Sequence, residues 1–288
     1  MGARIAWLRL YVALFLWVPG ILLTLAQDGN EPGPRKITVA ELLQSAVSHR
    51  WTDETRAEQF TYRETWRNRN FSTSGALLVD QSARFEAIAL HGQLYLRMTA
   101  RDGKPLSGAE EEQESQSYDA AIAGSKGLAM PQRVAALVTK DINLGLQLDL
   151  LPDFYRCELI GIEPIDGRNS VHLDCTPRRD RKPHGKAPAQ GMNFRVQVWV
   201  DEQDHTFARV DAQLLKNQDG FLPGSRISLV WSPVEEVWLP TKMSVRGETK
   251  ARHGPVQVET EYSFSAYRRF RTDVRILNTT PIDNQPQK

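Results

Sequence analysis

The amino-acid sequence predicts a mainly β (α+β) protein built on one strongly curled antiparallel sheet of about eleven strands. Apolar and polar residues alternate in many short runs, and turn signals such as Asp-Gly separate these runs. Helical apolar stripes are confined to two regions, 38–47 and 107–143. Strands joined by short hairpins form a single antiparallel sheet, and a sheet of this length coils toward a barrel. The helices are then expected to cover its concave apolar face.

The first 26 residues have the order of a secretory signal peptide. Two arginines precede an apolar run over 10–23, and small residues end at Ala26, where we place the cleavage. The alternative is a retained membrane anchor, but the run of about 14 residues is interrupted by Pro19, and a spanning helix needs ~20. No cysteine follows the cleavage point, so we expect a protein exported across the inner membrane, soluble and without a lipid anchor. A flexible polar leader is expected over 27–36.

A helix and the first group of strands follow the leader. Thr38 and Glu41 have the spacing of a capping box, which predicts the start of a helix. The period then changes from helical to alternating, and a turn is expected over 102–105. The helix stripe consists of Val39, Leu42, Leu43, Ala46 and Val47, and the strands are expected over 57–69, 75–80, 84–90 and 93–101.

A helical insert is expected over about 107–143, between two groups of strands. Ser107 and Glu110 repeat the capping-box spacing, and acidic residues fill the first turns. Pro131 suits the first turn of a second helix. The stripe of that second helix consists of Val134, Leu137, Val138 and Ile142. Leucines alternate over 144–150, which leaves the end of this helix open.

After Pro152 the sequence predicts almost only strands. Asp166-Gly167 between two apolar runs is a strong hairpin signal. Counting outward from this turn brings Cys157 and Cys175 nearly opposite each other, as a disulfide requires. The alternatives are two buried reduced thiols or a redox pair, and the C-x-x-C spacing of a redox pair is lacking. Strands are expected over 154–163, 168–176, 194–200, 207–215, 225–231, 237–247 and 256–267, and a disordered tail over 278–288.

Composition and motifs exclude several functional classes. The formal net charge is +1, which gives no footprint for a nucleic-acid partner. Neither a hydrolase elbow, a zinc helix, a P-loop nor a Rossmann glycine pattern is present, so we predict no catalytic residue, metal or cofactor.

Two clusters of charged residues leave alternatives open. The first cluster, over 201–205, suits a metal site or, as we favour, a solvated turn between two strands. The second cluster, over 178–182, lies in a basic loop over 177–191. It suits contact with anionic membrane headgroups, or an ordinary exposed loop. The first consists of Asp201, Glu202, Asp204 and His205, and the second of Arg178, Arg179, Arg181 and Lys182.

Three motifs resemble the LolA-like superfamily of bacterial periplasmic lipoprotein carriers and their relatives. The family's G-x-E-x-I-x-G-R hairpin matches Gly161, Glu163, Ile165, Gly167 and Arg168, within FYRCELIGIEPIDGRNSVHLDCTP. Its lWiD strand matches VQVWVD over 196–201, and its vWlPt strand matches VWLPTKMSV over 237–245. These motifs cover about the last 120 residues, while the first half agrees only in the order of its elements. The resemblance implies a half-barrel domain over 37–277, with helices in its concave face and no catalytic residues.

The resemblance leads to two hypotheses for function. The first is a non-enzymatic periplasmic carrier-like protein that holds acyl chains of a lipid or lipoprotein in an apolar half-barrel cavity. The second is an envelope interaction or sensor module of the same fold, with a filled core and no lipid. A hydrolase with dispersed carboxylates and histidines is a third, less favoured alternative. The expected cavity residues are Leu94, Leu96, Met98, Val134, Leu137, Val138, Val196 and Val198.

Overall fold

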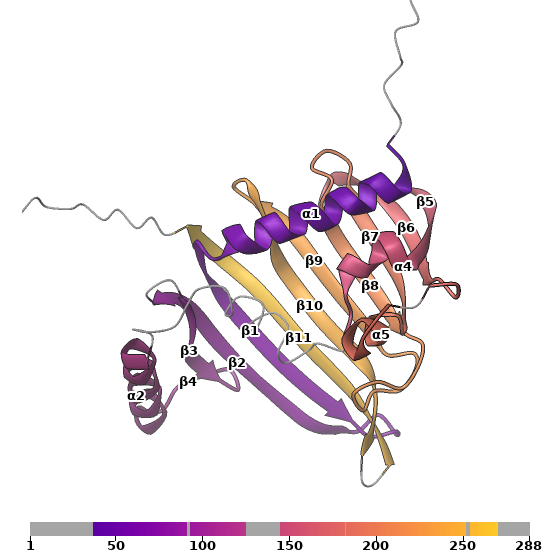
Figure 1. Ribbon diagram of the computed structural model, residues 1–288. Coiled ribbons are helices and arrows are strands. Elements are labelled where there is room, and N and C mark those ends of the chain that lie inside the picture. Colours follow the sequence, from indigo (N-terminus) through magenta and orange to yellow (C-terminus); the bar gives the residue numbers. More distant parts are fainter. Residues whose placement is uncertain (1–36, 91–92, 125–144, 182, 252–253, 270–288) are drawn as a thin grey trace, which may run out of the picture. The chain divides into compact units, whose positions relative to one another are not determined.

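An open antiparallel sheet of eleven strands dominates the computed structural model, which describes residues 37–90, 93–124, 145–181, 183–251 and 254–269 (Figure 1). The strand order is β4-β3-β2-β1-β11-β10-β9-β8-β7-β6-β5, and every neighbouring pair is antiparallel. The two edge strands, β4 and β5, do not pair with each other, so the sheet curls without closing. The predicted fold class is confirmed.

Strands follow one another as neighbours almost throughout, and the one long connection joins β4 to β5. The strands are β1 (Phe60–Phe71), β2 (Leu77–Leu90), β3 (Gln93–Arg101), β4 (Lys104–Pro105), β5 (Tyr155–Ile165), β6 (Arg168–Pro177), β7 (Phe194–Asp201), β8 (Phe207–Leu214), β9 (Arg226–Val234), β10 (Val237–Ala251) and β11 (Gly254–Arg269). The helices are α1 (Val39–Ala57), α2 (Gly108–Gly124), the 3-10 turn η3 (Leu148–Leu150), α4 (Leu151–Phe154) and α5 (Lys186–Gly191).

The number of strands matches the sequence prediction, although two of the expected strands are merged into one and one short strand is added. The runs expected over 75–80 and 84–90 form one strand, because the ladder between β1 and β2 continues without a break through Gln81 and Ser82. The expected turn after β3 contributes instead the two-residue strand β4. Its corner residues Asp102 and Gly103 have φ of 48° and 75°, the positive values that a tight hairpin turn requires.

Helix α1 begins where the sequence predicts. The Thr38 side chain accepts a hydrogen bond from the backbone N–H of Glu41, and the Glu41 carboxylate accepts one from the Thr38 N–H. The apolar stripe lies in the main core, and the helix contacts β5, β7, β8 and β10. The buried residues of this stripe are Leu42, Leu43, Ala46 and Val47, and Val39 is partly buried against the same core.

The hairpin of β5 and β6 is also as predicted. Asp166 and Gly167 form its corner with φ of 47° and 80°. Cys157 lies directly opposite Cys175 in the ladder, and the two form a disulfide. The alternative of two buried reduced thiols is thereby set aside. Covalent closure of this hairpin fixes the register of the edge strand β5.

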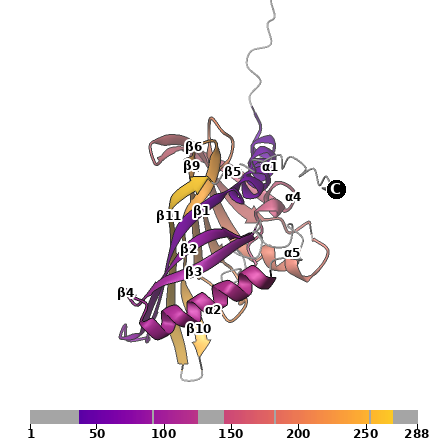
Figure 2. The ribbon, with the colours of Figure 1, turned by 90° about the vertical axis from the view of Figure 1, so that its left-hand side faces the viewer.

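Helix α2 lies along the edge of the sheet. It runs beside β3 (Figure 2), where it contacts Tyr95, Arg97 and Arg101. The Tyr95 hydroxyl donates to Glu114, and the Tyr118 ring packs against Tyr95 at 5.4 Å. Tyr95 and Arg97 point away from the face of Leu96, whereas Arg101 lies beyond a bulge and opposite Ala83, so α2 contacts side chains of both faces at this edge. None of the described side chains of α2 is buried, so its sequence has too narrow an apolar stripe to occupy a core.

Several expectations lie outside the described residues. These are the signal peptide over 1–26, the leader over 27–36, the second insert helix and the tail over 278–288. Among the described residues, no helix has the length and apolar character needed to cross a bilayer. The alternating leucines before Pro152 belong to η3 and α4, which bury Leu148, Leu150 and Leu151 in the main core.

We predict that removing the disulfide destabilises the fold without changing it. The cross-link joins residues 18 apart, and closing a loop of this length contributes about 3 kcal/mol. The double variant Cys157→Ala/Cys175→Ala is therefore expected to melt about 6–12 °C lower than the parent by circular dichroism. Reducing the parent protein should lower its melting point by a similar amount and leave the double variant unaffected. An unchanged melting point would contradict the prediction.

Candidate functional site

The face of the sheet toward α1, which we call the inner face, can be followed from strand to strand. Met98 lies opposite Phe85, Phe85 opposite Glu64, and Glu64 opposite Phe264. Directly opposite residues of an antiparallel ladder point to the same side. Tyr262, two residues before Phe264, shares that side because side chains alternate along a strand.

The same side continues across the rest of the sheet into the main core. Tyr262 lies opposite Met243, Met243 opposite Leu229, Leu229 opposite Val210, and Val210 opposite Val198. Met98 and Val198 therefore lie on one continuous inner face, although many strands separate them.

The half of the inner face over β6 to β8 is filled. Val196 and Val198 have 0% exposed surface and belong to the core cluster that contains the α1 stripe. Phe194, Val200 and Val210 are equally inaccessible in the same cluster. The chain's own side chains therefore occupy this half.

The half over β1, β2, β3 and β11 is apolar and only partly covered. Its rings contact each other: Tyr62 lies 5.8 Å from Phe264, and Tyr262 lies 6.5 Å from Phe264. Phe264 is buried, whereas the other members keep intermediate exposure. We call this group the aromatic face, and it consists of Tyr62, Trp66, Phe85, Leu96, Met98, Tyr262 and Phe264.

One carboxylate interrupts the aromatic face. Glu64 is only 7% exposed and lies between Phe85 and Phe264 in the ladders. Burial raises the pKa of Tyr62 and of Tyr267, and the charge of Glu64 raises both further. Both phenols therefore stay neutral at physiological pH, so the rings present uncharged surface around this single acid.

The predicted cavity residues fall into two separate groups. Leu96 and Met98 are half-buried on the aromatic face, whereas Val196 and Val198 lie in the filled core. Six strands separate β3 from β7, so the structure does not bring these two groups together. Val134, Leu137, Val138 and the side chain of Leu94 lie outside the described residues. The sequence missed the aromatic members, because only the ladder registers show which side of β1, β2 and β11 faces inward.

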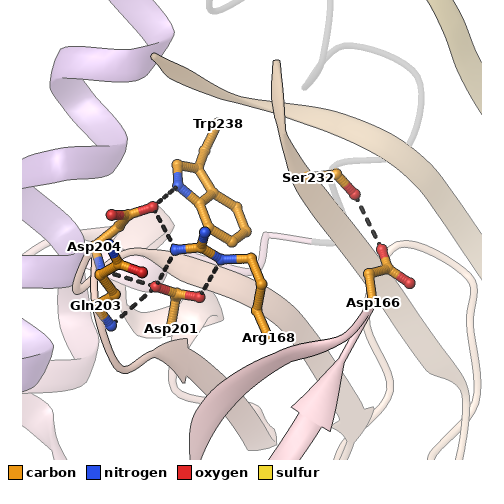
Figure 3. Close-up of polar contacts among 7 residues, drawn as sticks. All are labelled: Asp166, Arg168, Asp201, Gln203, Asp204, Ser232 and Trp238. Carbon is orange, nitrogen blue, oxygen red and sulfur yellow. Dashed lines mark hydrogen bonds and ion pairs between the residues drawn. The ribbon is translucent and has the colours of Figure 1, made fainter. Parts of the chain in front are cut away.

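A polar cluster joins the three motifs of the sequence (Figure 3). The Arg168 guanidinium donates two hydrogen bonds to Asp201, at 2.7 and 2.8 Å, and one to Asp204 at 2.7 Å. The guanidinium carbon lies 5.4 Å from the centre of the Trp238 ring, and the Trp238 indole N–H donates to Asp204 at 3.0 Å. One arginine thus connects the β5–β6 hairpin, the β7–β8 turn and the start of β10.

Asp201 is the acceptor on which this cluster is centred. Asp201 is 1% exposed, and its carboxylate also accepts hydrogen bonds from the backbone N–H groups of Gln203 and Asp204. Burial alone raises the pKa of the Asp201 carboxyl, but the hydrogen bonds from Arg168 and from the two N–H groups outweigh burial and lower it. In the same figure Ser232 donates to Asp166, which ties the hairpin tip to β9.

A second cluster of polar and aromatic side chains lies on the outer face of the sheet. Glu163 accepts hydrogen bonds from the Trp199 indole at 2.9 Å and pairs with His172 at the same distance. The rings of His172 and Trp199 stack at 4.2 Å, and the Arg209 guanidinium lies 4.9 Å from the Trp199 ring. The hydrogen bonds from Trp199 and His172 lower the pKa of Glu163. This cluster holds strands β5 to β8 together from outside.

The two clusters of charged residues singled out in the sequence have structural partners. Between β7 and β8 the carboxylates of Asp201 and Asp204 bind Arg168, as in a polar turn. Within the part of the chain that the structure describes, no group of three acidic, histidine or cysteine residues could hold a metal. In the basic loop, Arg178 pairs with Asp180 and Arg181 donates to the carbonyl of Asp153. Arg179 is exposed, and Lys182 lies outside the described residues.

Comparison with known proteins finds similarity between this chain and solved structures only. Neither a protein-family model nor a curated protein matches the chain. A LolA superfamily protein from Nitrosomonas europaea is 11% identical, with 82% of this chain and 95% of that chain covered and a TM-score of 0.32.

Two further structures are similar to the same degree. A putative outer membrane lipoprotein-sorting protein domain from Vibrio parahaemolyticus is 12% identical over 81% of this chain and 95% of its own, with a TM-score of 0.35. The lipoprotein LppX from Mycobacterium tuberculosis is 11% identical over 80% and 96%, with a TM-score of 0.30. At these identities and TM-scores the comparisons transfer neither a family nor the role of any residue to this chain.

We predict that the Arg168–Asp201 pair contributes substantially to stability. Asp201→Asn removes the charge from a buried acceptor, and hydrogen bonds to charged groups contribute about 1.5–3 kcal/mol. Urea denaturation at pH 7 should show a loss in this range. Asp80→Asn is the matched control, because Asp80 forms the same two-bonded pair with Arg67 at an exposed site, where solvent screens the charges, and this variant should lose clearly less stability. Equal losses in the two variants would refute the prediction.

The same variant makes a prediction about pH. The pKa of Asp201 lies below its usual 3.8, so the ionised carboxylate stabilises the folded state above that pH. This stabilisation is lost as the pH falls from about 4 through the lowered pKa. The stability difference between the parent and Asp201→Asn should therefore be constant from pH 7 to 5 and shrink below pH 4. A difference that persists at pH 2.5 would contradict the assignment.

Proposed function

We propose that this protein is a non-enzymatic carrier-like protein of the bacterial periplasm that binds acyl chains of a lipid or lipoprotein on its aromatic face. The observation that supports the proposal most is the division of the inner face. The half beneath α1 is packed with its own side chains, whereas the half over β1, β2, β3 and β11 presents apolar side chains of intermediate exposure. An acyl chain is the ligand that gains most from such a surface, at about 0.8 kcal/mol for each buried CH₂.

The composition of the aromatic face suits a flexible apolar chain. Large rings provide area at little cost in conformational entropy, and Met98 adapts its shape to irregular ligands.

The sequence and the disulfide support the proposed location. A cleaved signal over 1–26 would deliver the chain to the periplasm, where the Cys157–Cys175 cross-link can form and persist. Contact with anionic headgroups through the basic loop remains part of the proposal, with Arg179 as an exposed cation of this loop. Arg178 and Arg181 already have partners within the chain, so this contact is expected to be weak.

The filled half supports one alternative function. Val196 and Val198, which the sequence placed in the cavity, are fully buried against α1. A protein-interaction or sensor module with a filled core would need no ligand on the inner face, and the binding experiment below separates it from the carrier.

We predict that a charge on the aromatic face abolishes acyl binding. Met98→Glu should weaken binding of a long-chain fatty acid and of a diacylated lipopeptide at least about tenfold, because an acyl chain cannot solvate a carboxylate. The measurement is displacement of a fluorescent fatty-acid probe, together with native mass spectrometry of the purified protein.

Leu77→Glu is the matched control. Leu77 is 54% exposed on the adjacent strand β2 and lies opposite Phe71, which is seven residues after the inward-facing Glu64 and therefore points away from the inner face. This variant should bind as the parent does. If the parent carries no lipid, and neither probe binds or raises its melting point, the carrier function is wrong and the interaction module is favoured.

A further inference from the structure

The edge strand β5 exposes an unusual amount of apolar surface. It ends the sheet opposite to the two-residue strand β4, and none of the strands that the structure describes pairs with its outer backbone edge. Leu159, Ile160 and Ile162 are 61%, 56% and 57% exposed, within four consecutive residues. Natural proteins usually protect long edges with charges or cover them, because bare edges pair with other chains.

A bulge at the middle of β5 changes which residues share a face. The ladder with β6 shifts between Leu159 and Gly161, so Ile160 is the extra residue. Before the bulge, Arg156 and Glu158 lie on the outer face, since Cys157 opposite the buried Cys175 points inward. After the bulge, the alternation of side chains is shifted by one residue. Odd-numbered residues now point outward, and Glu163 is on the outer face opposite Ser170.

We propose that two copies of this chain associate through β5, edge to edge and antiparallel, about a two-fold axis between Leu159 and Ile160. In this register Arg156 lies opposite the partner's Glu163, and Cys157 lies opposite the partner's Ile162. The bulge makes the register possible, because it brings outer-face residues opposite outer-face residues throughout the pair. The exposed leucine and isoleucines then meet at the centre, and two symmetric Arg–Glu pairs flank them.

Charge selects this register over its neighbours. A shift by two residues in one direction would place Glu158 opposite the partner's Glu163, and like charges directly opposite are unfavourable. A shift in the other direction would place Arg156 opposite the partner's Gly161, without an ionic partner.

The side chains involved are suitably placed for this pairing. Glu163 is already held by Trp199 and His172 and stays 48% exposed, while the Arg156 side chain is 78% exposed. Pro164 has no N–H to donate, so we confine the pairing to Arg156–Glu163. An interface of one short strand pair is small, and we therefore expect a weak, reversible dimer.

Sedimentation equilibrium of the full exported chain, over a range of concentrations, tests the proposal. The parent protein should show a monomer–dimer equilibrium. Ile160→Lys should weaken the dimer at least about tenfold, because it brings two cations together at the two-fold axis. Leu78→Lys is the matched control, since Leu78 has the same exposure as Ile160, on a strand remote from β5, and it should leave the dimer unchanged.

The charge pair provides a second, register-specific test. Arg156→Glu places two acids opposite each other and should weaken the dimer, whereas Arg156→Lys should largely preserve it. Circular dichroism melting of each variant verifies that the monomer is folded, so that a loss of dimer is not a loss of fold. A parent that stays monomeric at every concentration, or variants Ile160→Lys and Leu78→Lys that dimerise equally well, would overturn the proposal. The result is independent of whether lipid binds to the aromatic face.

Discussion

The packing of α1, η3 and α4 against the inner face is the constraint on which the rest of the structure depends. Together these helices cover only part of a very wide sheet, and their buried side chains fill the inner face over that part. Among the described residues, the strands farther along the sheet carry an inner surface that this core does not use. The aromatic face is the outcome of this mismatch between the short helices and the width of the sheet.

The sequence predicted local features well and long-range ones poorly. Thr38 with Glu41, Asp166-Gly167 and the opposition of Cys157 to Cys175 all depend on residues close in the chain, so spacing alone reveals them. The division of the inner face depends instead on β1 pairing with β11, about 200 residues apart, and no local pattern shows that pairing. For this reason Val196 and Met98 were grouped together in one predicted cavity although they lie in different halves.

The motif residues acquire a physical meaning only in three dimensions. The arginine after the hairpin, the aspartate after VQVW and the tryptophan of VWLP are widely spaced in sequence, yet they meet around one guanidinium. Each ends or begins a strand, and each turn would otherwise be free to change its angle. The charged groups of this cluster are paired with one another. We therefore assign these residues to the geometry of the sheet and not to the proposed binding of acyl chains.

The position of the disulfide has a consequence for how the sheet opens. An edge strand normally detaches first, since only one neighbour holds it. Here β5 is bonded covalently to that neighbour, directly across the ladder, so it cannot leave without β6. The smallest unit that can separate from this end of the sheet is the whole hairpin, and Arg168 ties that hairpin to the turn beyond it. Separation of this hairpin therefore also requires breaking the contacts of Arg168 with Asp201 and Asp204.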